Sequence, residues 1–154
     1  MIPLQSHAGE VHLSDFKNQL ILLSFGYTHC PDVCPATLLH VSQALNLLSI
    51  AERKKVQAIF FSVDPQRDTP ELLNKYVQYF HNDMIAVNAE GLNYSRFLKA
   101  FNIESQQLSD DPNYEISHTS YLFLLGDDAK VLDIMGHETA AKFIAEAIRK
   151  HLKD

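Results

Sequence analysis

The sequence predicts an α/β fold in which helices cover a mixed β-sheet. Three apolar runs, at residues 20–25, 56–63 and 119–125, have the length and composition of buried strands. A helical pattern follows each of the first two runs, and a returning strand and a closing helix follow the third. This order of elements, βαβ, then αβ and a final ββα, is typical of helices packed on a sheet.

Local signals place the remaining elements. Asp68 or Thr69 is expected to cap a helix that has Pro70 in its first turn. The polar, acidic segment around Asp110 and Asp111 is expected to form an exposed loop. In order, the predicted elements are a strand and turn (10–16), a strand (20–25), a helix (34–51), a strand (56–63), a helix (70–81), a weak strand (84–88), a short helix (94–101), an exposed loop (105–116), a strand (119–125), a turn (126–129), a strand (130–135) and a helix (139–152).

The composition is that of a soluble globular protein. At 154 residues, the chain is expected to form one domain, residues 1–154, that buries about two-thirds of its unfolded surface. The formal net charge of −6 gives no reason to expect nucleic acid or an anionic membrane as a partner. We find no segment that is long and apolar enough to span a bilayer, and no signal peptide.

The chain's two cysteines, Cys30 and Cys34, are expected where the first buried strand ends and a long helix begins. A helix N-terminus directs unpaired N–H groups and a partial positive charge at such a site, which favours the thiolate over the thiol. If the helix begins a little before Cys34, the two sulfurs can converge on one small ion or on each other, because positions four apart lie on one face of a helix. Two thiolates suit Cu(I) or zinc. The alternative is a pair of buried, inert cysteines.

Three segments resemble the motifs of the Sco/SenC family. Residues 26–35 (GYTHCPDVCP) resemble the first motif, residues 62–70 (SVDPQRDTP) the second, and residues 117–121 (SHTSY) the third. The resemblance extends over nearly the whole chain. It implies a thioredoxin-like fold with an extra N-terminal strand or hairpin. It also implies a copper-binding protein that serves assembly of the dinuclear copper centre of cytochrome c oxidase.

The resemblance implies a set of metal ligands as well. His118, in the third motif, would join Cys30 and Cys34 in a Cys₂His site that holds Cu(I), and Cu(II) with a weak fourth ligand. Without the resemblance, His118 is one of eight histidines, and a histidine before a strand is usually a solvent-facing residue. The family commonly has an aspartate directly before this histidine, where this chain has Ser117.

Two aspartates of the second motif, Asp64 and Asp68, are candidates for supporting roles next to the metal ligands. Asp64 follows the C-terminal end of a predicted strand, where open α/β sheets place ligands. A carboxylate there could orient a ligand or dock a partner. His29, directly before Cys30, could tune the pKa of that thiol or deliver copper.

Several functions could use these residues. A metallochaperone would bind copper at Cys30, Cys34 and His118 and pass it by ligand exchange to the copper-bearing subunit of cytochrome c oxidase. A thiol–disulfide reductase or a redox sensor would use the two cysteines as a catalytic redox pair and would not need the histidine. A peroxidase is disfavoured because Tyr27 and Pro31 stand where its usual threonine would precede a reactive cysteine. Structural zinc accepts the same donors.

The resemblance also suggests a location and partners. Family members are usually tethered outside the cytoplasm by an N-terminal transmembrane helix. We therefore expect a soluble fragment of a protein anchored at the periplasmic face of a bacterial inner membrane, with the mitochondrial intermembrane space as the alternative. Besides the oxidase subunit, the expected partners are another copper chaperone and a thioredoxin-like reductant, and the protein itself is expected to be a monomer.

Overall fold

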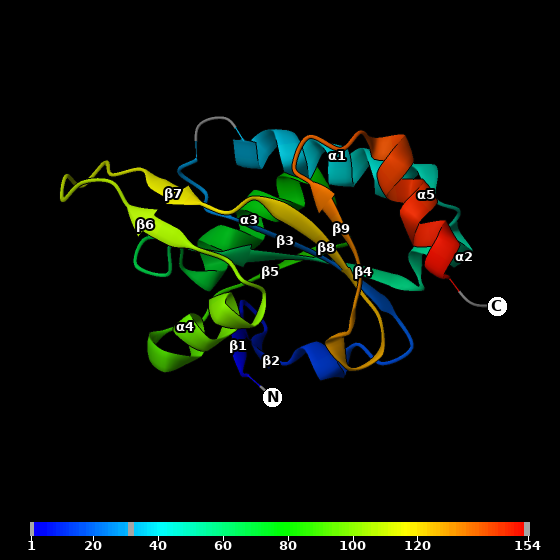
Figure 1. Ribbon diagram of the computed structural model, residues 1–154, viewed down its shortest axis with the longest axis horizontal. Coiled ribbons are helices and arrows are strands. Elements are labelled where there is room, and N and C mark those ends of the chain that lie inside the picture. The colour runs from blue at the N-terminus through cyan, green and yellow to red at the C-terminus, as the bar shows by residue number, and fades with distance from the viewer. Residues whose placement is uncertain (1, 31–32, 153–154) are drawn as a thin grey trace.

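A five-stranded mixed sheet forms the centre of the computed structural model, which describes residues 2–30 and 33–152 (Figure 1). Pro31 and Asp32 of the first motif therefore lie outside the described residues. The strands, in spatial order, are β5 (Met84–Val87), β4 (Val56–Ser62), β3 (Leu20–Gly26), β8 (Tyr121–Leu125) and β9 (Val131–Gly136). The first three are parallel, whereas β8 runs antiparallel to both β3 and β9.

The two central parallel strands are buried along almost their whole length. In β3 only Leu20 is partly exposed, and in β4 only Gln57. Strands that are covered on both faces are apolar throughout, without the alternation of a half-exposed strand. This explains why the runs 20–25 and 56–63 are visible in the sequence, and the prediction of an α/β fold with a mixed sheet is confirmed.

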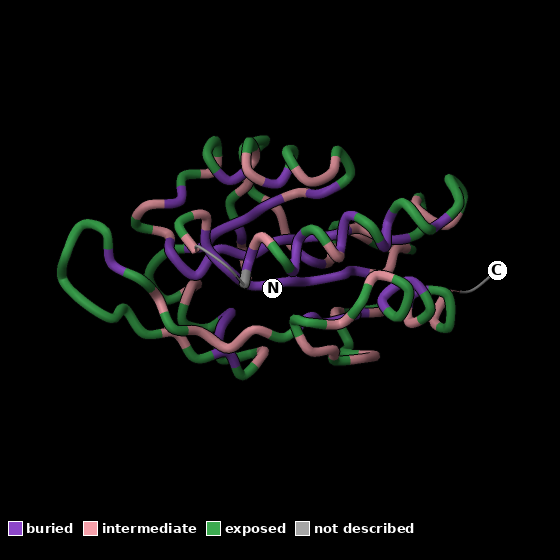
Figure 2. The backbone as a smooth tube through the Cα atoms, turned by 90° about the horizontal axis from the view of Figure 1, so that it is seen from above, coloured by how far each residue is buried: buried purple, intermediate pink, exposed green. Residues whose placement is uncertain are grey.

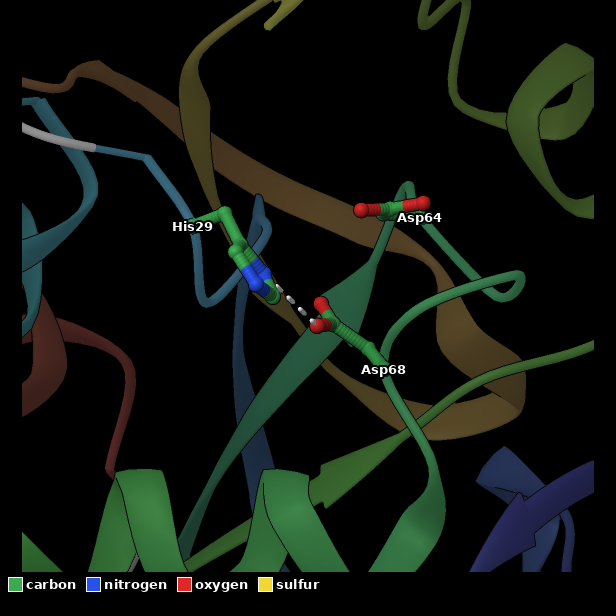
Figure 3. Close-up of side chains that lie close together, drawn as sticks. All are labelled: His29, Asp64 and Asp68. Carbon is green, nitrogen blue, oxygen red and sulfur yellow. Dashed lines mark ion pairs between the residues drawn. The ribbon is translucent and has the colours of Figure 1, made fainter. Parts of the chain in front are cut away.

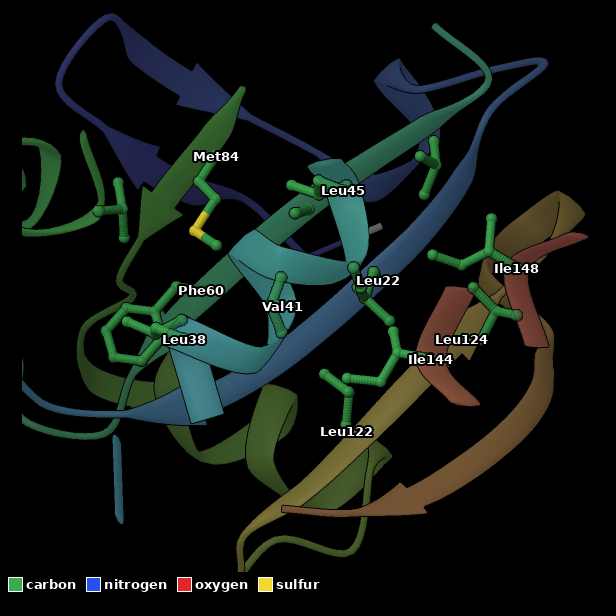
Figure 4. Close-up of a cluster of buried hydrophobic side chains, with 14 of the residues drawn as sticks. Leu22, Leu38, Val41, Leu45, Phe60, Met84, Leu122, Leu124, Ile144 and Ile148 are labelled. Carbon is green, nitrogen blue, oxygen red and sulfur yellow. The ribbon is translucent and has the colours of Figure 1, made fainter. Parts of the chain in front are cut away.

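Three helices cover one face of the sheet: α1 (Val33–Leu47), α3 (Pro70–Phe80) and α5 (Ala141–His151). Figure 4 shows how the side chains of Leu38, Val41 and Leu45 in α1 meet those of the sheet. Ile144 and Ile148 of α5 complete this apolar cluster beside β8. Burial of such side chains is the main contribution to the stability of this layer.

The opposite face is covered by smaller elements. A hairpin of β1 (Leu4–Ser6) and β2 (Gly9–Val11), the 3-10 turn η1 (Leu13–Asp15) and the helix α4 (Gly91–Ala100) pack there. The ring of Phe97 in α4 stacks on that of Phe61 in β4, with 4.3 Å between the ring centroids. The hairpin confirms the extra N-terminal strands that the resemblance implies.

The prediction of one helix over residues 34–51 is wrong. Helix α1 ends at Leu47, and a short helix, α2 (Ile50–Arg53), starts after Ser49. The Ser49 hydroxyl accepts a hydrogen bond from the Glu52 amide (3.1 Å), and the Glu52 carboxylate accepts one from the Ser49 amide (2.8 Å). This reciprocal capping box starts a new helix. The apolar pattern continues across the break and therefore conceals it.

The predicted loop over residues 105–116 is also partly wrong. β6 (Ser105–Gln107) pairs antiparallel with β7 (Ile116–His118), so that residues 105–118 form a projecting hairpin that we call the arm. The strand expected from residue 119 begins only at Tyr121. Figure 2 shows that the loop between the arm strands is exposed almost throughout. Strands this short and polar carry no apolar alternation, so the sequence pattern cannot reveal them.

The helices α3, α4 and α5 are observed close to the positions where the sequence predicts helices. The cap of α3 is Thr69, whose hydroxyl accepts from the Leu72 amide (3.2 Å), so Asp68 is available for another role. Helix α4 starts three residues earlier than the predicted helix over 94–101. Within the described part of the chain, no helix is both long and apolar enough to cross a membrane.

Candidate metal centre

The two cysteines lie at the end of the central strand. β3 ends at Gly26, the chain continues through Tyr27 to Cys30, and α1 begins at Val33. Cys34, in the first turn of α1, is 2% exposed, and Cys30 is partly exposed. A Cβ atom at Gly26 would lie 2.5 Å from the Cys34 sulfur, closer than real contacts allow. Glycine at this position therefore permits the sulfur to pack against the strand end.

The local environment keeps Cys34 protonated. A hydrogen bond between the Cys34 thiol and the Cys30 sulfur, together with burial, raises the pKa of Cys34 well above the ordinary value for a thiol. The prediction that the helix N-terminus favours a thiolate is therefore wrong for Cys34, because two negative sulfurs cannot lie side by side in a buried site without a compensating cation. The pair thus has a partly exposed member, Cys30, and a buried, protonated one, Cys34.

His118, at the end of β7, faces the buried cysteine. Its Nε2 atom lies 3.8 Å from Cys34 Sγ, and its Nδ1 atom lies 3.0 Å from the carbonyl oxygen of Thr119. A carbonyl only accepts hydrogen bonds, so Nδ1 carries the ring proton. The lone pair of Nε2 is then directed at the sulfur, as a metal-ligating imidazole requires.

Tyr27 holds the histidine from the body of the molecule. Its hydroxyl accepts a hydrogen bond from the Ile116 amide (3.0 Å), and its ring meets the His118 ring edge to face, with centroids 5.9 Å apart. The side chain of Ser117 is exposed, because neighbouring residues of a strand point to opposite faces. The ring of His118 therefore takes its orientation from Thr119 and Tyr27, and the position where the family commonly has aspartate faces solvent.

Asp68 supports the cysteine segment. Its fully buried carboxylate accepts hydrogen bonds from the Thr28 amide (3.0 Å), the Thr28 hydroxyl (2.5 Å) and the Ser62 hydroxyl (2.7 Å). These three bonds join the segment before Cys30 to the end of β4. Asp68 thus fixes the approach to the thiols and lies one residue away from the helix cap.

His29, Asp64 and Asp68 form a second cluster, in which one ligand atom of each lies within 4.8 Å of the others (Figure 3). The ring of His29 turns toward Asp68, with 3.9 Å between Nδ1 and Oδ1, and its side chain is half exposed. Asp64 accepts hydrogen bonds from Arg67 Nε (2.6 Å) and from the Tyr114 hydroxyl (2.6 Å). Because protein donors already occupy both carboxylates, we assign no ion to this cluster.

The structure thus brings together Cys34, Cys30 and His118, and it places Asp68 beneath the segment that leads to them. Asp64 lies apart from the sulfurs and contacts the arm instead. The ligand assignment itself stays a prediction. No local pattern in the sequence indicates the residues that support the site, which are Tyr27, Arg67, Tyr114 and Thr119.

The fold and the site define a thioredoxin-like protein in which a dithiol faces a histidine. The SCO1/SenC family model matches residues 3–153, and the chain belongs to this family. The mitochondrial protein SCO2 homolog of Bos taurus is 30% identical over 153 residues, which are 97% of this chain. The chain spans 58% of the length of that relative.

Two solved structures extend the comparison. The structure of Bradyrhizobium japonicum ScoI with copper bound superposes with a TM-score of 0.88 and 27% identity, over 98% of this chain and 97% of the other. BsSco, described as having a disulfide switch and as a member of the Sco family of cytochrome c oxidase assembly proteins, superposes with a TM-score of 0.73 and 26% identity. That match covers 98% of this chain and 92% of BsSco. These similarities confirm the thioredoxin-like fold class.

Proposed function

We propose that this protein binds copper and passes it to the subunit of cytochrome c oxidase that carries the dinuclear copper centre. The observation that carries the proposal is the approach of His118 Nε2 to Cys34 Sγ, at 3.8 Å, beside Cys30. Membership of the SCO1/SenC family and the copper-bound structure of the Bradyrhizobium relative support it.

The donor set suits copper in either oxidation state. Two thiolates are soft ligands that favour Cu(I), and one imidazole completes a trigonal arrangement. Cu(II) would use Cys30, Cys34 and His118 with a weak fourth ligand. Each thiol gives up its proton when a metal binds, so the raised pKa of Cys34 makes binding tighter as the pH rises.

The exposure of the donors suits transfer by ligand exchange. Cys34 is buried, whereas Cys30 and His118 are partly exposed, and His118 borders an open hollow together with Ser105 and Thr119. A thiolate of the receiving protein can therefore reach the ion from the side of Cys30 and His118. We expect Cys34 to be the last ligand to release the ion.

The test is an anaerobic Cu(I) titration of the reduced protein against a competing chelator. We expect one tight equivalent in the wild type, none in Cys30→Ser or Cys34→Ser, and an affinity about tenfold or more lower in His118→Ala. His29→Ala is the matched control, because His29 neighbours Cys30 but turns toward Asp68, and it should bind copper like the wild type. Stoichiometric binding by either cysteine variant would contradict the ligand set.

A second function, thiol–disulfide reduction of the oxidase copper site, is favoured by the asymmetry of the cysteines. The exposed Cys30 would attack the partner's disulfide, which forms a mixed disulfide and releases one partner thiol. Cys34 would then lose its proton and attack the Cys30 sulfur, so that the second partner thiol leaves. The two electrons come from the dithiol, which ends as a disulfide. His118→Ala discriminates between the functions, since it should leave this reaction intact.

We place the protein outside the cytoplasm. The mitochondrial relative from Bos taurus supports this location, as does a solved SCO1/SenC family lipoprotein from Bacillus anthracis. Fractionation of cells that express the full-length protein would test the location. Recovery with cytoplasmic markers would contradict it.

A further inference from the structure

The arm that carries His118 has little structure of its own to hold it in place. Its two strands are three residues each, and their side chains are exposed or only partly buried. At its base, the Tyr94 hydroxyl donates to the Val63 carbonyl (2.8 Å) and lies 3.1 Å from Ser105 Oγ. A two-stranded hairpin is marginal without further packing. The position of His118 therefore depends on contacts between the arm and the body.

One such contact is buried near the far end of the arm. The Tyr114 hydroxyl donates to Asp64 Oδ1 (2.6 Å), and Arg67 Nε donates to Oδ2 of the same carboxylate (2.6 Å). The Arg67 guanidinium also lies over the Tyr114 ring, 3.5 Å from its centroid. Its Nη1 donates to the carbonyl of Pro112 (3.3 Å). We call Asp64, Arg67 and Tyr114 the clasp.

The clasp has the properties of a strong local contact. Asp64 is 2% exposed and Tyr114 is 7% exposed, so water does not compete for their hydrogen bond. Hydrogen bonds to an ionised group are about twice as strong as neutral ones. Burial, followed by the hydrogen bond to Asp64, raises the pKa of Tyr114 to about 12, so that the phenol remains a donor at physiological pH.

Two routes lead from the clasp to the histidine. Along the chain, Tyr114 lies four residues before His118, and the Ile116 amide between them is bound by the Tyr27 hydroxyl. Through space, the Arg67 guanidinium lies 5.9 Å from the centroid of the Tyr27 ring, and the Tyr27 ring also contacts the ring of His118. A shift of the clasp would therefore displace the imidazole.

We propose that the clasp of Asp64, Arg67 and Tyr114 positions His118 for copper and so sets the copper affinity without touching the metal. This inference rests on the proposed copper site. In this inference, Asp64 acts by holding the arm rather than by contacting the metal ligands. Arg67 and Tyr114 are positioning residues. The dithiol belongs to the other side of the site, so its oxidation should not depend on the clasp.

Tyr114→Phe tests the inference, because it removes one hydroxyl and keeps the ring under the guanidinium. Tyr79→Phe is the matched control, since it removes the hydroxyl of a tyrosine that is 85% exposed. In Tyr114→Phe, amide hydrogen exchange at Ile116 and Thr119, whose N–H groups bond to the Tyr27 hydroxyl and the Glu104 carbonyl, should become about tenfold faster, and Cu(I) should bind about tenfold more weakly. The rate of disulfide formation should match that of the wild type.

Two further readouts separate positioning from general damage. The thiolate-to-Cu(II) absorption band should shift in Tyr114→Phe but not in Tyr79→Phe, and urea unfolding of Tyr114→Phe should lose no more stability than the tenfold faster exchange of the arm accounts for. Arg67→Lys, which keeps the charge but loses the planar stack, should shift the band in the same direction. Unchanged exchange in the arm and unchanged copper affinity in Tyr114→Phe would overturn the inference.

The two proposals fail in different ways. If His118→Ala binds copper as tightly as the wild type, the proposed ligand set fails, and arm exchange in Tyr114→Phe still measures the clasp directly. If His118→Ala weakens copper but Tyr114→Phe changes neither arm exchange nor affinity, the ligand set stands and the clasp is wrong.

Discussion

The two sides of the candidate copper site are built in different ways. The cysteine side rests on β3, the central strand of the sheet, and Cys34 is packed against Gly26. The histidine side is the arm, a short polar hairpin outside the main sheet, joined to the body by the clasp and by Tyr27. A buried central strand is among the last parts of a protein to open, whereas exposed hairpins open easily.

This difference suggests a division of labour. In the proposed function, the cysteine side would provide the dithiol that both copper binding and disulfide exchange need. The arm provides one further ligand whose position can change without unfolding the sheet. A site of this kind can hold an ion tightly and still release it, because one ligand can move away while two remain. The predictions below test the two sides separately.

The largest effect is expected on the cysteine side, for Asp68→Asn. An amide accepts fewer hydrogen bonds than a carboxylate, and its NH₂ group would face the donors of Thr28 and Ser62 in a buried site. We expect the free energy of unfolding to fall by about 3 kcal/mol. Urea unfolding of the reduced protein measures this loss. Asp110→Asn, at an exposed position of the arm, is the control and should change nothing. An Asp68→Asn protein as stable as the wild type would show that the carboxylate does not hold the cysteine segment.

A smaller effect is expected for the alkylation rates of the two cysteines, which differ in exposure. Because the pKa of Cys34 is raised, its alkylation rate should still increase above pH 9, where an ordinary thiol with a pKa of about 8.5 is largely ionised. At neutral pH, iodoacetamide should modify Cys30 about tenfold faster than Cys34. Peptide mapping by mass spectrometry over a pH series gives both rates.

Cys30→Ser sharpens this test, because it removes the larger cause of the shift. Alkylation of Cys34 in that variant should begin at a lower pH than in the wild type. Equal alkylation of the two cysteines at neutral pH in the wild type would contradict the buried, protonated state of Cys34.

The smallest effect is expected on the arm, for Ser117→Asp, which introduces the residue that the family commonly has. The side chain is exposed and points away from the imidazole, and Thr119 already fixes the tautomer of His118. Copper affinity should therefore change by less than about threefold. Ser120→Ala is a useful companion variant, because it removes the hydroxyl whose Oγ lies 3.4 Å from His118 Nδ1. A tenfold gain in affinity for Ser117→Asp would show that this position acts on the metal directly.

The difference between the buried central sheet and the exposed arm also explains which elements could be predicted from the sequence. The strands β3 and β4 are apolar because both faces are covered, so their positions follow from the sequence. The dithiol at the end of β3 follows as well, from the two cysteines and the helical pattern after them. The helix break at Ser49 has a signal of its own, the Ser-x-x-Glu spacing of Ser49 and Glu52 that is typical of a capping box, but the apolar pattern that continues across the break conceals it.

The arm could not be predicted from its residues. Its strands are too short and polar for a periodic signal, and His118 stands out among eight histidines only through the family resemblance. The clasp joins residues fifty positions apart, Asp64 and Tyr114, which no local pattern connects. The sequence signal at Asp68 is ambiguous, because Asp68 precedes the true cap, Thr69, and could itself be a cap as well as a supporting residue of the site.

The most direct test of a site shared by the two sides is Cu K-edge X-ray absorption of the reduced, Cu(I)-loaded protein. We expect two sulfur ligands and one imidazole nitrogen in the wild type, and two sulfurs without the imidazole in His118→Ala. A sulfur-only first shell in the wild type, or identical spectra for the two proteins, would show that the arm contributes no ligand and would contradict the account.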